Sequence, residues 1–211
     1  MHRNVVRSAT YLYALRWYIA LNAGIFLLSF LLGVCTGVLE PEVAHEVFGG
    51  AEGSIQQRVD MLLHVLSVLG VPEWLYFLGF IVLIFLNNTT LSLVAMLMAL
   101  LPPFFITPLG FVALNGYIVG IVVFFSSSPF MAAVGILPHG IIEIPMILFA
   151  TSMGTRLGWL TIKWIMGRGK SPKDELLRSI ETFLYLIAPM LLLAALVEVI
   201  ITGSLLYVLN Q

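Results

Sequence analysis

The residues best able to do chemistry are a few polar side chains inside long apolar stretches of the sequence. His139 and Glu143 are four positions apart, so on a helix they share one face. Glu198 lies in a later apolar stretch, from which its carboxyl group could approach them. An imidazole and two carboxyls can hold helices in register, carry a proton or ion, or ligate a metal such as zinc.

Amide side chains accompany these ionisable groups near the centres of the predicted membrane spans. An acidic group at the centre of a membrane helix costs about 2.5–3.5 kcal/mol on insertion scales. We therefore expect the polar groups to face each other inside a bundle, in one layer at mid-depth. The helix carrying His139 also contains two prolines, each of which removes a backbone donor, and a glycine that allows bending. The predicted polar cluster comprises Asn87, Asn88, Asn115, Pro138, His139, Gly140, Glu143, Pro145 and Glu198.

The composition identifies an integral membrane protein. Of 211 residues, 60% are hydrophobic and 10% are charged, whereas a soluble domain has about 25% charged residues. The mean hydropathy of +1.05 excludes both a water-soluble globule and a disordered chain. A net charge of −1 provides no basic surface for nucleic acid, so the expected surroundings are membrane lipids. The single cysteine excludes an intrachain disulfide and a cysteine-based metal cluster.

Hydrophobic run lengths predict an all-α, polytopic membrane helix bundle that forms one domain over residues 1–211. A helix crosses a hydrocarbon core of about 30 Å with about 20 residues. Five runs are long enough, and the predicted spans are 17–39, 74–101, 108–125, 130–153 and 182–209.

The distribution of charge predicts how these spans are oriented in the cell membrane. Basic residues fall almost entirely within 1–16 and 154–181, while acidic residues gather within 40–73. Because basic loops stay on the cytoplasmic side, we expect a cytoplasmic amino terminus and a carboxyl terminus outside.

Two segments outside the spans are predicted to lie at the membrane surfaces. On the outer side, the pairs Gly49-Gly50 and Gly53-Ser54 indicate a loop, followed by an amphipathic helix over about 55–69 that ends near Gly70 and Pro72. On the inner side, a basic apolar segment over 156–168 is expected at headgroup level, with Trp159 and Trp164 as anchors.

Four short sequences occur in order: FLNNTT at 85–90, NGYIVG at 115–120, ILPHGIIEIP at 136–145 and VEVIITG at 197–203. With them the chain resembles the stage II sporulation protein M family of integral membrane proteins. The resemblance implies a membrane scaffold that assembles with two peptidoglycan-degrading partners, the stage II sporulation proteins D and P. It implies no catalytic residue.

We therefore predict a scaffold or assembly protein that is not an enzyme, with no cofactor and no bound metal. The polar cluster would organise the bundle, and the partners would be membrane or cell-wall-associated proteins. The alternative is a transporter or channel subunit in which Glu143 or Glu198 titrates as a proton, ion or small solute passes. Because five spans make a thin pore, transport would require a homodimer.

A third hypothesis is an intramembrane metal enzyme with His139, Glu143 and Glu198 as zinc ligands. Against it, the sequence contains neither the HExxH helix of metalloproteases nor a serine nucleophile elbow.

Overall fold

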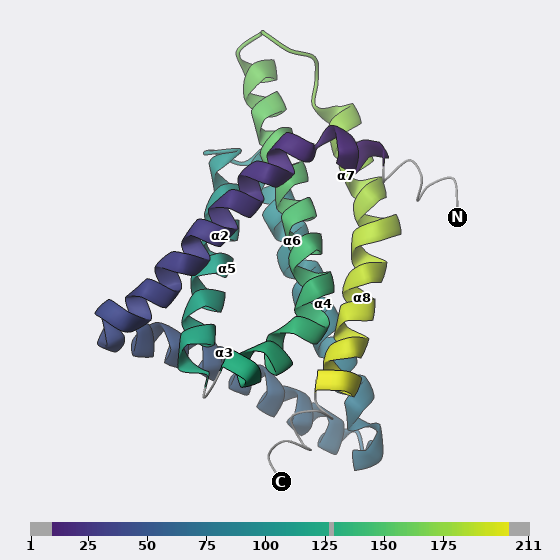
Figure 1. The fold of residues 1–211 in the computed structure, drawn as a ribbon. Helices are drawn as coiled ribbons and strands as arrows, with labels where there is room; N and C mark the ends of the chain where they lie inside the picture. The colour runs from purple at the N-terminus through teal and green to yellow at the C-terminus, as the bar shows by residue number, and fades with distance from the viewer. Residues whose placement is uncertain (1–9, 127–128, 203–211) are drawn as a thin grey trace.

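The structure, a computed structural model, describes residues 10–126 and 129–202, which are helical with short connections and contain no strand. Figure 1 shows the helices as a bundle with one long helix lying across its lower end. Five helices are long and apolar enough to cross a membrane, which confirms the prediction of an all-α membrane bundle. They are Arg16–Leu39, Glu73–Leu100, Ile106–Phe125, Leu137–Ile165 and Lys173–Ile201.

The chain passes through the bundle in a simple order. A helical turn at residues 10–14 precedes α2 (Arg16–Leu39), and α3 (Pro41–Val68) follows. The next span consists of η1 (Glu73–Leu75), α4 (Tyr76–Leu97) and η2 (Met98–Leu100). Then come α5 (Ile106–Phe125), α6 (Pro129–Ile165) and the last span, built from α7 (Lys173–Thr182), η3 (Phe183–Ile187), α8 (Ala188–Val197) and η4 (Glu198–Thr202). We call the end where α3 lies the α3 end, and the opposite end the α7 end.

Two pairs of glycines bring α2 and α5 into backbone contact. Gly33 and Gly37 lie one turn apart on α2, and Gly116 and Gly120 lie one turn apart on α5. A Cβ atom added at Gly120 would overlap the carbonyl oxygen of Phe30, so the helices can approach this closely only without a side chain. Small residues at such spacing let membrane helices gain van der Waals contact, which replaces the hydrophobic driving force that lipid removes.

We expect Gly120→Ala to destabilise the bundle by about 1–3 kcal/mol, because the new methyl group forces the helices apart. Gly110→Ala on the same helix is the matched control, since a Cβ atom there has nothing within 4 Å. Thermal unfolding in detergent micelles measures both effects. Equal unfolding midpoints for the two variants would show that the α2–α5 contact is not tight.

The helix at the α3 end is longer than predicted, and the expected loop at 49–54 is wrong. Pro41 cannot continue α2, yet its fixed φ suits the first turn of a new helix, so α3 begins there. Each glycine inside a helix costs about 1 kcal/mol relative to alanine. Packing offsets that cost, because the His45 and Phe48 rings lie 4.6 Å and 5.0 Å from the Phe125 ring of α5.

The helices of the last two predicted spans, 130–153 and 182–209, extend beyond those ranges. α6 continues without interruption to Ile165, so the predicted interfacial basic segment is its last part and no separate element. Figure 1 shows that α6 is bent in its first third and extends past the start of α2. The last span begins at Lys173, and its predicted end at 209 lies outside the described residues.

A buried polar network closes the α7 end, beside an apolar core that includes Leu15, Met153 and Leu191. The Tyr11 hydroxyl donates to Glu175 Oε1 at 2.5 Å and lies 3.0 Å from Ser179 Oγ. Arg156 Nε forms an ion pair with the same Glu175 oxygen at 2.8 Å, and only 7% of the Glu175 side chain is exposed. Burial and the hydrogen bond to Glu175 raise the pKa of Tyr11, so the phenol remains a donor. The network thus joins the start of the chain to α6 and α7.

Tyr11→Phe should lower the free energy of unfolding by about 1.5–3 kcal/mol, because a buried hydrogen bond to a charged group is lost. Tyr13→Phe serves as the control, since Tyr13 is 70% exposed. Denaturation in detergent compares the two variants, and an equally small effect of both would contradict this role for the network.

Candidate functional site

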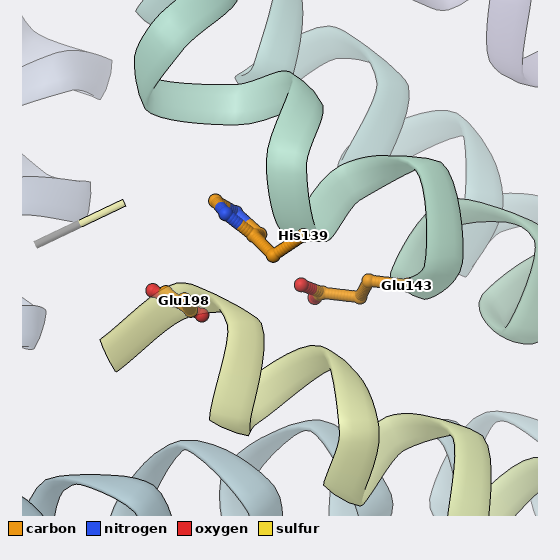
Figure 2. A group of neighbouring side chains, drawn as sticks. All are labelled: His139, Glu143 and Glu198. Atoms are coloured by element: carbon orange, nitrogen blue, oxygen red, sulfur yellow. The ribbon is translucent and has the colours of Figure 1, made fainter. Parts of the chain in front are cut away.

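Three ionisable side chains converge at the α3 end of the bundle. Figure 2 shows His139 and Glu143 projecting from successive turns of α6 toward Glu198 of η4. One potential ligand atom from each residue lies within 4.8 Å of the other two. All three side chains are partly buried, so they face a common space within the protein.

Local helix geometry explains how each of these groups is placed. His139 and Glu143 are i and i+4 on α6, which puts them on one face of that helix. Pro138 and Pro145 lie within α6, close to both side chains, and each lacks a backbone hydrogen-bond donor. Gly140, which follows His139, is buried. Glu198 opens a π-helical segment, a local widening that often occurs at functional sites.

These side chains border a cavity of about 410 Å³ between α3, α4, α6 and η4. Its wall is apolar on much of its surface, with polar groups gathered on one part. The lining residues are Ile55, Arg58, Val59, Phe80, Leu83, Ile84, Asn87, Asn88, His139, Glu143 and Glu198. The cavity therefore joins residues from four elements that are far apart in the sequence.

Arg58 of α3 lines the cavity and was missed by the sequence prediction. Its guanidinium donates to Asn87 Oδ1, and Asn87 Nδ2 donates to Asn88 Oδ1 at 3.0 Å. The charge distribution contained a signal, because Arg58 is the one basic residue between positions 17 and 155.

Asn115 does not belong to the cluster, which corrects the sequence prediction. Its Nδ2 donates to the Phe111 carbonyl on its own helix at 2.8 Å, and it does not line the cavity. Asn87 and Asn88 lie near the middle of the helical span Glu73–Leu100, as predicted from the sequence. Because α3 also borders the cavity, the cluster lies on the side of the bundle that α3 covers.

The charges of the site are only partly compensated. Among the described residues, neither the Glu143 nor the Glu198 carboxyl has a hydrogen-bond or ion-pair partner, and His139 Nδ1 is buried without a partner. Two facing carboxylates repel each other, and a proton or a cation between them relieves that repulsion. The arrangement can therefore hold a proton or bind a cation.

The fold and this site define a multi-pass helical membrane protein with a polar cavity at one end of the bundle. Residues 23–203 match the family described as stage II sporulation protein M, and the chain belongs to this family. The match confirms the resemblance found in the sequence, and the family is not a known enzyme family. No curated protein and no solved structure matches the chain.

Arg58→Ala should release α3 from α4, because the hydrogen bond from Arg58 to Asn87 connects them. We expect amide hydrogen exchange in the second half of α3 to become about tenfold faster. Gln57→Ala is the matched control, since Gln57 is an exposed neighbour on the same helix. Unchanged exchange in Arg58→Ala would show that the cluster does not hold α3.

Proposed function

We propose that the protein is a membrane scaffold that assembles with membrane or cell-wall-associated proteins, and that it is not itself an enzyme. Family membership supports this role, because the resemblance implies partners that degrade peptidoglycan. The polar cluster would organise the α3 end of the bundle, where partners would bind.

The position of α3 supports a scaffold role most directly. This 28-residue helix lies across the end of the bundle and presents exposed acidic side chains, among them Glu42, Glu46 and Glu52. Arg58 and the ring contacts of His45 and Phe48 hold it in place. A fixed helix that displays charge can orient a partner and determine which partner binds.

The sidedness that we propose places this surface outside the cell. Arg156, Lys163, Arg168 and Lys170 lie at or near the α7 end, and basic segments remain in the cytoplasm. The amino terminus would then be cytoplasmic and the carboxyl terminus outside. On that assignment α3 faces the compartment in which cell-wall enzymes act.

Affinity purification of the full chain from its native membranes tests the proposal. We expect the eluate to release soluble fragments from purified cell wall, because a peptidoglycan-degrading partner is retained. Reversing two α3 charges with Glu46→Lys and Glu52→Lys should lower the recovered activity about tenfold, through loss of charge complementarity. Asp174→Lys is the matched control, because Asp174 is exposed on α7 at the other end.

Two results would contradict a scaffold role at α3. One is that the variant with Glu46→Lys and Glu52→Lys recovers as much wall-degrading activity as the Asp174→Lys control. The other is that the unaltered chain recovers none. Ion flux in proteoliposomes that Glu143→Gln and Glu198→Gln abolish would instead establish the transport alternative.

A further inference from the structure

We propose that His139, Glu143 and Glu198 bind one divalent transition-metal ion, with Zn²⁺ as the best match to the donor set. This site is separate from the surface proposed for partner binding, which lies on the exposed face of α3. The scaffold role neither requires the metal nor excludes it.

The geometry brings three ligands close to bonding positions. Tetrahedral coordination at about 2.1 Å from the metal places ligand atoms about 3.4 Å apart. The three candidate atoms already lie within 4.8 Å of one another, so the largest contraction required is about 1.4 Å. Rotation of the two glutamate side chains can supply this movement without moving the backbone, because each has three rotatable bonds.

Electrostatics favour a cation at this position. The carboxyls of Glu143 and Glu198 face each other, and no partner for either occurs among the described residues. Arg58 lines the same cavity, but its guanidinium is hydrogen-bonded to Asn87. A divalent ion would balance both carboxylates.

The histidine adds a second and independent reason for a metal. His139 Nδ1 is buried and has no hydrogen-bond partner in the described structure. A buried polar atom without a partner costs free energy, whereas a nitrogen bound to a metal uses its lone pair.

The donor set distinguishes between metals. One imidazole nitrogen with two carboxylate oxygens suits Zn²⁺ and related transition metals, while Ca²⁺ and Mg²⁺ prefer oxygen ligands alone. Three protein ligands leave a fourth position, and the cavity of about 410 Å³ adjoins it. Water or another small oxygen ligand from the cavity would complete the coordination.

Metal analysis of the purified full chain tests the site. The protein carries a tag without histidines, is stripped with a chelator, and is dialysed against buffered free Zn²⁺ in detergent. We expect about one equivalent of zinc per chain, and less than about a tenth of an equivalent in His139→Ala and Glu198→Gln. Glu73→Gln is the matched control, because it removes an exposed carboxylate that does not line the cavity.

A second measurement on the unaltered chain does not depend on how the variants fold. Adding Zn²⁺ to the stripped protein should raise its unfolding midpoint by about 5 °C, because the ion binds only the folded state. Mg²⁺ at the same concentration should leave the midpoint unchanged.

Less than about a tenth of an equivalent in the unaltered chain would overturn the proposal. So would full zinc binding by both cluster variants, which would place the ion elsewhere. Neither result affects the recovery of wall-degrading activity, so failure of the metal site and failure of the scaffold role can be told apart.

Discussion

Water is scarce inside a membrane bundle, so each polar side chain there needs a partner within the protein, and this constraint shapes both ends of the structure. At the α7 end, the Tyr11 hydroxyl and the Arg156 guanidinium both reach the Glu175 carboxylate. That network is closed, because the charge of the acid is matched and its oxygen accepts a hydrogen bond. It joins the start of the chain to the last two long helices, and a satisfied buried network makes the surrounding packing specific.

The α3 end meets the same constraint differently. There the Asn87 amide accepts a hydrogen bond from Arg58 and donates one to Asn88. In contrast, the Glu143 and Glu198 carboxyls and His139 Nδ1 have no partner in the described structure. A polar cluster in which some groups lack hydrogen-bond partners lowers the stability of the fold. Such clusters persist where a ligand or a function compensates for the lost free energy. The gathering of three such ionisable side chains on one cavity is the physical reason to regard the α3 end as the functional one.

The two proposals concern different faces of this end. α3 separates them, because its exposed face carries the acidic side chains while Ile55, Arg58 and Val59 line the cavity beneath. A metal ion in the cavity would join α6 to η4 and thereby fix the wall on which α3 rests. The glycine contact between α2 and α5 lies outside this site, and it gives the bundle a rigid side from which α3 extends across to α4.

The sequence by itself determined the helices, the membrane class and the pairing of His139 with Glu143. These features depend on run length, composition and a spacing of four residues, all of which are local. Only the tertiary structure decided that Glu198 meets this pair, that Arg58 joins it, and that Asn115 stays on its own helix. The physical reason is that helix crossing and rotation depend on close packing between distant segments, as at the glycines of α2 and α5. The tertiary structure also decided that α3 is continuous, because packing against Phe125 outweighs the tendency of the α3 glycines to break the helix.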